Sequence, residues 1–145
     1  MPALYNPNRI VICGSISHYP SLVECGFRVA ALGFLAVLPP SDDEFLARAG
    51  MTPNDLKKSL SLKHFDEITN SETSAILVVN NPKRGLENYI GPNAFAEVAV
   101  AVSARKAVFL LHEIFEPYEE ELIAWGAVPL GGQIDGLAKH IERQS

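Results

Sequence analysis

Four short apolar runs are the feature that most limits the folds open to this chain. They are rich in Val, Ile, Leu and Phe, and they occupy residues 10–13, 34–38, 75–80 and 107–111. Continuous apolar runs of this length are typical of strands buried on both faces of a parallel sheet. Helical patterns lie between the runs. The alternation predicts one α/β domain over 1–145, with a parallel sheet and helices on both of its faces.

Turn and capping residues set the expected limits of the helices. Thr52, Pro53 and Asp55 have the form of an N-cap, a first-turn proline and an acid at the positive end of a helix. A last short strand at 127–130 contains Pro129, which is typical of an edge strand. Helices are expected at about 19–32, 41–49, 52–70, 94–104, 117–125 and 134–143.

Composition and charge exclude several classes of protein. The chain has 145 residues, of which 48% are hydrophobic and 20% charged, as in ordinary globular domains. Its net charge of -5, without a run of Lys or Arg, argues against a nucleic-acid polymer as partner. No signal-peptide pattern is visible, and the apolar stretch 29–38 is too short to span a bilayer. We therefore expect a soluble, cytoplasmic protein.

The segment around Glu97 is the strongest candidate for a site. Glu97 is the only charged residue between Ala94 and Val102, in an apolar helical stretch that follows the strand at 75–80. It either lies on a thin solvent-facing stripe or has a partner or a task. The second interpretation gains weight because open α/β sheets bind ligands at the carboxyl ends of their strands. A helix this apolar also predicts a homodimer or higher homo-oligomer through 93–104.

Other motifs are weaker. Gly14-Ser15-Ile16-Ser17 follows the first strand and is either a plain turn or a loop that holds a phosphate or sugar oxygen. It matches neither the P-loop nor the dinucleotide-binding pattern. The four histidines and two cysteines show no metal-ligand spacing, so we expect surface or partly buried histidines and reduced core thiols. The histidines are His18, His64, His112 and His140, and the cysteines are Cys13 and Cys25.

Asp66 and Glu97 form a possible carboxylate pair, because their helices flank the strand at 75–80. Two carboxylates at one pocket suit a reaction through an oxocarbenium-like transition state. One attacks or stabilises the sugar, and the other handles protons. The simpler interpretation is that Asp66 is an exposed acid on an amphipathic helix.

Together these segments resemble the nucleoside 2-deoxyribosyltransferase superfamily, which also contains the deoxynucleoside 5'-monophosphate N-glycosidases. The resemblance covers most of the chain. Its most specific parts are the strand at 75–80, Asn-Tyr-Ile-Gly-Pro-Asn at 88–93, Ala96-Glu97, and 106–111. It implies a flavodoxin-like three-layer sandwich with a five-stranded parallel sheet in the order 2-1-3-4-5. It implies no metal or redox cofactor.

The resemblance also implies roles for individual residues. Glu97 is then the nucleophile that attacks the anomeric carbon of a (deoxy)ribosyl group, and Asp66 the acid that assists the leaving base. Asn93 contacts the sugar or the carboxylate, and Tyr89 stacks on the base. The Gly-Ser-Ile turn is similar to one that holds a 5'-phosphate in the glycosidase branch. The remaining substrate-binding candidates are Gly14, Ser15, Ile16, Ser17, Asn80 and Gly91.

Three functions stay open at this point. The first is cleavage or transfer at the N-glycosidic bond of a nucleoside or its 5'-monophosphate. The second is a nucleotide-binding or sensor module that does no chemistry, which a pocket without Asp66 favours. The third is an assembly protein whose apolar helix is an interface, which an arginine sealing Glu97 favours. Two departures from the family pattern are Ser74, in place of an acid, and Ser17-His18-Tyr19, in place of arginine and glycines. A third is the loop before Glu97, which is longer than in the transferases and carries no Asp at the expected place.

Overall fold

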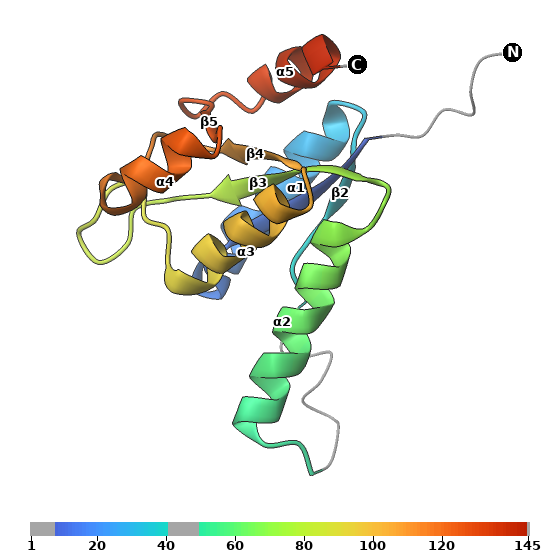
Figure 1. Ribbon diagram of the computed structural model, residues 1–145, viewed down its shortest axis with the longest axis vertical. Helices are drawn as coiled ribbons and strands as arrows, with labels where there is room; N and C mark the ends of the chain where they lie inside the picture. The colour runs from blue at the N-terminus through green and yellow to red at the C-terminus, as the bar shows by residue number, and fades with distance from the viewer. Residues whose placement is uncertain (1–7, 41–49, 145) are drawn as a thin grey trace, which may run out of the picture.

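The computed structural model describes residues 8–40 and 50–144. It contains a parallel five-stranded sheet in the order β2-β1-β3-β4-β5 (Figure 1). This confirms the α/β class and the strand order 2-1-3-4-5. The strands are β1 (Arg9–Gly14), β2 (Leu35–Val37), β3 (Thr73–Val79), β4 (Ala107–Leu110) and β5 (Val128–Pro129).

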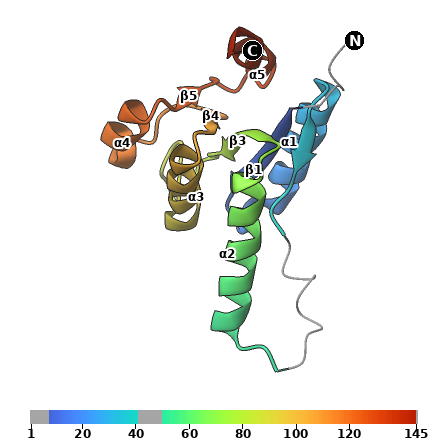
Figure 2. The same ribbon diagram turned by 45° about the vertical axis from the view of Figure 1, so that its right-hand side comes forward.

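Helices cover both faces of the sheet, as expected. One layer consists of α1 and α5, and the other of α2, α3 and α4 (Figure 2). The helix expected at 41–49 lies outside the described residues. The α-helices are α1 (Tyr19–Ala31), α2 (Pro53–Thr69), α3 (Pro92–Ser103), α4 (Glu119–Ala124) and α5 (Gly136–Gln144), and the 3-10 helices are η1 (Ile16–His18) and η3 (Glu116–Tyr118).

The central strands are apolar because both of their faces are covered. In β1, Ile10 and Ile12 pack toward α1 and α5, whereas Val11 and Cys13 pack toward the α2–α3–α4 layer. The second strand differs from the expectation. This strand, β2, lies at an edge of the sheet, and its residue Leu35 is 47% exposed. The prediction of a buried strand was therefore wrong there.

The helix α2 extends beyond the carboxyl end of the sheet (Figure 1). Thr52 is its N-cap, and a capping box with Asp55 satisfies backbone groups at both positions. These local bonds support a helix end that has little sheet beneath it. Only the later part of α2 buries side chains, namely His64 and Ile68. The overhanging first turns are thus free to form a wall of the cavity described below.

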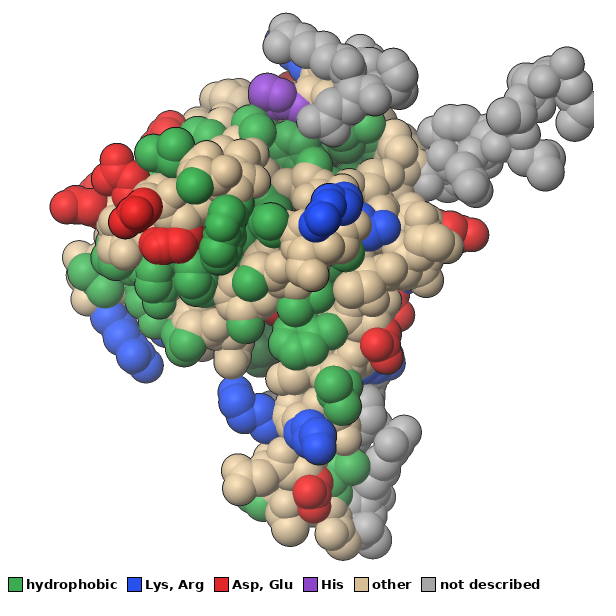
Figure 3. Space-filling model, viewed as in Figure 1, with side chains coloured by type: hydrophobic (Ala, Val, Ile, Leu, Met, Phe, Trp, Pro, Cys, Tyr) green, Lys and Arg blue, Asp and Glu red, His purple; other side chains and the backbone are tan. Residues whose placement is uncertain are grey.

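The apolar helix α3 is partly covered by its own chain. The ring of Phe95 stacks on Tyr118 and Trp125, with centroid distances of 4.0 and 5.6 Å. Ala96 and Ala99 remain exposed. Hydrophobic side chains gather on this side of the molecule over α3 and α4 (Figure 3). A partner subunit on this face stays a prediction. Within the described residues, no helix is both long and apolar enough to cross a membrane.

Candidate functional site

A cavity of about 630 Å³ lies at the carboxyl ends of β1 and β3. These two strands are neighbours, but the chain leaves them toward opposite sides of the sheet, which makes this the topological switch point where α/β folds bind ligands. The cavity size suits a small molecule such as a nucleotide. The overhanging part of α2 adds Pro53, Leu56, Lys57, Leu60 and Ser61 to its lining.

Most residues singled out from the sequence line this cavity. They come from the end of β1 with the loop after it, from the loop before α3, and from the first turns of α3. The sequence-predicted residues that line it are Gly14, Ser15, Ile16, Ser17, Tyr89, Gly91, Asn93 and Glu97.

Gly14, at the end of β1, allows the backbone to pack closely against Leu22 and Val79. A Cβ atom at this position would lie 2.7 Å from the Leu22 side chain and 3.2 Å from the Val79 carbonyl oxygen. Both distances are shorter than ordinary contacts, so a larger residue would push the following loop away from β3. The glycine therefore has a packing reason to be here, and it sets where Ser15 and Ser17 enter the cavity.

Lys83 is a cavity residue that the sequence interpretation missed. Its Nζ donates a hydrogen bond of 2.8 Å to Ser15 Oγ, and it lies 5.8 Å from the centre of the Tyr89 ring. Ser15 Oγ is also 2.7 Å from Ser17 Oγ. Lys83 belongs to a tight turn in which Arg84 and Gly85 have positive φ angles of 54° and 75°. This turn brings a cation over the loop after β1, a placement with no short-range signal in the sequence.

The Glu97 carboxyl group meets two side chains from other elements. Its Oε2 atom lies 3.3 Å from His64 Nε2 on α2, and His64 Nε2 lies 3.5 Å from Cys13 Sγ on β1. Cys13 is fully buried, His64 is 3% exposed, and the Glu97 side chain is 13% exposed. Three reactive groups therefore meet at the floor of the cavity, which His64 and Glu97 line.

Burial keeps all three groups in their uncharged forms near neutral pH. It raises the pKa of Glu97 to about 8, although the Cys13 thiol opposes part of this shift. It lowers the pKa of His64 to about 4, against a smaller opposing effect of the Ile12 backbone. Burial, and then the neighbouring Glu97, raise the pKa of Cys13 well above its usual value. These shifts favour a protonated Glu97 beside a neutral His64 at neutral pH, with 3.3 Å between Oε2 and Nε2.

His64 was expected to be a surface or partly buried histidine, and that expectation was wrong. The signal that identifies it is its position in the four-residue repeat Leu56, Leu60, His64 and Ile68, which marks the inner face of α2. A histidine on such a face has to find a polar partner. Its Nε2 does so, whereas Nδ1 has no hydrogen-bond partner among the described residues.

The structure does not bring Asp66 to the cavity. Asp66 is exposed on α2 and does not line the pocket. The reason is helical geometry: two residues along a helix turn through about 200°, so the turn that buries His64 directs Asp66 to solvent. The expected Asp66–Glu97 pair is therefore replaced by a His64–Glu97 pair.

Asn80 also has a different place from the one expected. It is completely buried and does not line the cavity. Its side chain accepts a hydrogen bond of 2.9 Å from the His112 backbone N–H and donates one of 2.7 Å to the Glu113 carbonyl. It thus joins the loops after β3 and β4. This is a structural task, and it supports the cavity only indirectly.

Comparisons with known proteins add no evidence on the role of this cavity. The sequence matches no family model, and no curated protein matches it significantly.

Proposed function

We propose that this protein binds a nucleoside 5'-monophosphate in the cavity and acts at its N-glycosidic bond through Glu97. The observation that carries this proposal is the Glu97 carboxyl group, set beside His64 at the floor of a cavity at the β1–β3 switch point. The resemblance of 75–80, 88–93 and 96–97 to the nucleoside 2-deoxyribosyltransferase superfamily supports it independently of the geometry.

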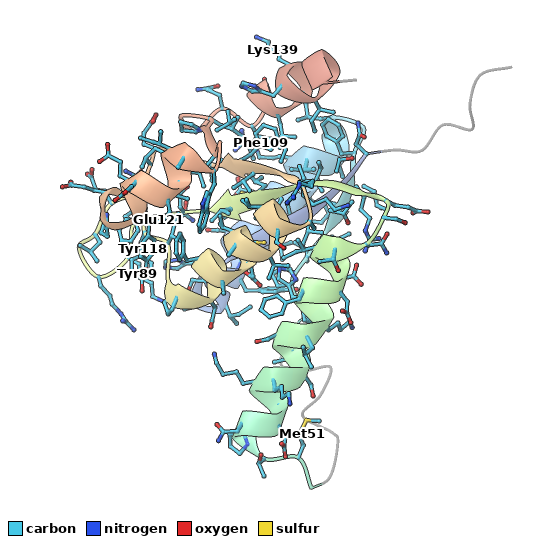
Figure 4. All side chains as sticks on the ribbon, viewed as in Figure 1. Met51, Tyr89, Phe109, Tyr118, Glu121 and Lys139 are labelled. Carbon is cyan, nitrogen blue, oxygen red and sulfur yellow. The ribbon has the colours of Figure 1, made fainter. Side chains whose placement is uncertain are left out.

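The lining suits the two halves of a nucleotide. Leu56, Leu60 and Val79 form apolar wall, and the Tyr89 ring offers a face on which a base can stack. Tyr89 is held by an edge-on contact with Phe115, 5.5 Å between centroids. Tyr89 lies in the loop that leads into α3, beside the beginning of that helix (Figure 4). A base held between apolar walls would leave the sugar toward the floor, where Glu97 is.

Charge favours a phosphorylated substrate. The cavity lining includes three cations, Lys57, Lys83 and Arg84, and Glu97 is the one acid among its described residues. The whole chain carries a net charge of -5, so this cationic lining runs against the overall balance. Lys83 already donates to Ser15 Oγ, beside the loop amides after β1. Lysine and hydroxyl donors together are suited to a phosphate group.

The His64–Glu97 pair can supply both the nucleophile and the proton that the reaction needs. In the resting state the carboxyl group is protonated, and a carboxylic acid is a poor nucleophile. Transfer of this proton to His64 Nε2, 3.3 Å away, leaves a carboxylate. Its oxygen forms a bond to the anomeric carbon while the C–N bond breaks and its electron pair leaves on the base. The proton taken up by His64 then passes to the departing base, which leaves as a neutral molecule.

A second step would complete the cycle. Water or another base attacks the anomeric carbon, the ester bond to Glu97 breaks, and the carboxylate is regenerated. With water as acceptor, its proton returns to the His64–Glu97 pair. With a second base as acceptor, the N–H proton of that base returns to the pair, and the product is a new nucleoside 5'-monophosphate. The same groups serve both routes, so both belong to the proposal.

Release of free base tests this proposal. The protein is incubated with deoxynucleosides, ribonucleosides and their 5'-monophosphates in the presence of a chelator, and bases are separated by chromatography. We expect release from a monophosphate, lowered at least about a thousandfold in Glu97→Gln. The matched control is Glu120→Gln, because Glu120 is an exposed acid on α4. Equal release by the wild type and Glu97→Gln would contradict the proposed role.

The placement of Asp66 favours a second candidate, a nucleotide-binding module without chemistry. The exposed Asp66 leaves the cavity without the second carboxylate that the enzyme family implies. The same experiment separates the two candidates. If every substrate survives but a monophosphate raises the melting temperature, the site is a sensor. No arginine pairs with Glu97 among the described residues, so the interface alternative gains no support.

A further inference from the structure

We propose that Cys13, His64 and Glu97 form a binding site for a thiophilic divalent metal ion, with Zn²⁺ as the preferred ion. Each residue offers one ligand atom, and the three atoms lie within 4.8 Å of one another. Metal binding does not depend on the proposed function. The expected effect of the metal, inhibition of base release, does rest on the proposed function, because a Glu97 carboxylate bound to a metal cannot attack a sugar.

Two of the three distances between the ligand atoms match the edges of a tetrahedral site. Zn–S bonds of about 2.3 Å and Zn–N or Zn–O bonds of about 2.0–2.1 Å give ligand–ligand edges of about 3.6 Å for S–N and about 3.3 Å for N–O. The observed distances are 3.5 Å between Cys13 Sγ and His64 Nε2, and 3.3 Å between His64 Nε2 and Glu97 Oε2. Two edges of the tetrahedron are therefore already in place.

The donor set selects among metals. A thiol sulfur, an imidazole nitrogen and a carboxylate oxygen suit Zn²⁺ and similar borderline ions, whereas Mg²⁺ and Ca²⁺ require oxygen ligands. A thiolate and a carboxylate together also neutralise a divalent ion, so the occupied site has no net charge in its buried surroundings. The resulting charge balance is what a buried site requires.

The site is rigid on one side and open on the other. Its ligands come from β1, α2 and α3, and Cys13 is part of the core between the sheet and α3. His64 and Glu97 line the cavity, which leads from solvent to these two ligands and leaves room for a fourth ligand, whereas Cys13 lies buried behind them. Three protein ligands with an open position are typical of accessible zinc sites. Spacing along the sequence hides this site because its members are 51 and 33 residues apart (His64 minus Cys13, and Glu97 minus His64).

Cobalt binding tests the site without reference to activity. Metal-free protein is titrated with Co²⁺, and a thiolate-to-cobalt charge-transfer band is followed together with the visible bands of tetrahedral Co²⁺. We expect one equivalent of Co²⁺ to produce both, and Zn²⁺ to displace it. Mg²⁺ should produce no displacement. Absence of the charge-transfer band in the wild type would overturn the proposal.

Two cysteine variants make the test specific. Cys25 is also buried, but it lies on α1 on the other side of the sheet. Cys25→Ser should keep the charge-transfer band, and Cys13→Ser should lose it and bind Zn²⁺ at least about 100-fold more weakly, since even outer partners of a ligand are worth 10- to 100-fold. Glu97→Gln should weaken Zn²⁺ binding as well and covers the case in which Cys13→Ser fails to fold. Wild-type affinity in Glu97→Gln, or an unchanged band in a folded Cys13→Ser, would overturn the site.

Base release with and without Zn²⁺ then separates the two proposals. Inhibition by Zn²⁺ that a chelator reverses, and that Cys13→Ser lacks, would support both the site and the reaction. A cobalt site without any base release would leave the metal site standing and remove the proposed function. Base release that Zn²⁺ does not affect, in a protein that binds Co²⁺ at Cys13, would overturn the link to Glu97.

Discussion

Replacement of Glu97 by Gln should change how stability depends on pH. In the folded protein burial raises the pKa of Glu97 from its usual 4.5 to about 8. Between these values the folded state holds a proton that the unfolded state has lost, so stability falls as pH rises. The His64 pKa, lowered from 6.5 to about 4, acts in the opposite direction between pH 4 and 6.5. There the two effects largely cancel.

The uncancelled window extends from about pH 6.5 to about pH 8. Over these 1.5 units, at about 1.4 kcal/mol per unit, the wild type should lose about 2 kcal/mol of unfolding free energy. The Glu97 side chain is 13% exposed, so little of this is screened by solvent. Besides His64, the charged or titratable groups around Glu97 are the Cys13 thiol and, elsewhere in the cavity lining, Lys57, Lys83 and Arg84. The raised pKa of the thiol keeps it uncharged in this window.

Urea unfolding at several pH values between 6.5 and 8, with a chelator present, measures this effect. We expect the wild type to lose about 2 kcal/mol across the window and Glu97→Gln to lose almost none. Glu120→Gln should follow the wild type, because that acid is exposed on α4. Parallel curves for the wild type and Glu97→Gln would refute the inference that Glu97 is protonated in the folded protein.

Three further substitutions test the cavity. Lys83→Met should raise the KM for a 5'-monophosphate roughly 10- to 100-fold, as expected for the loss of one charge-assisted hydrogen bond, and leave the KM for the nucleoside unchanged. The control Lys139→Met, on α5 (Figure 4), should change neither KM. Equal effects of Lys83→Met on both substrates would contradict a phosphate contact. Asp66→Asn should keep kcat/KM within about twofold, and a large loss would restore its expected catalytic role. Gly14→Ala should destabilise by about 1–3 kcal/mol in urea unfolding because its Cβ meets Leu22, and an unchanged stability would contradict that close approach.

The helices and strands were predictable because their signals are local, whereas the strand order was expected only from the family resemblance. Continuous apolar runs identified β1, β3 and β4, and Thr52 with Pro53 placed the start of α2 correctly. Pro129 correctly indicated an edge strand. The burial of β2 was not predictable in the same way. Its apolar run resembles the others, and only the order of the assembled sheet places it at an edge with Leu35 half-exposed.

The candidate site was predictable only in part, for a related reason. Glu97 stood out as a charge within an apolar helix, and Gly14-Ser15 as a turn after a buried strand. Which residues face them depends on tertiary packing. The rotation of α2 about its axis determines that His64, and not Asp66, faces Glu97. The packing of β1 against α2 and α3 places Cys13 beside His64 and Glu97. The sequence pattern of α2 contained this information in its four-residue repeat, but not the identity of the partner.

Trapping of a glycosyl intermediate tests the central claim most directly. A nucleoside 5'-monophosphate with fluorine at C2' slows both steps by destabilising the oxocarbenium-like transition state, and the metal-free protein is then analysed by intact-mass and peptide mass spectrometry. We predict a mass increase of one fluorinated sugar phosphate, located on the peptide that contains Glu97 and absent from Glu97→Gln. An adduct on another residue, or base release by the wild type with no adduct on Glu97 under any trapping condition, would contradict the account.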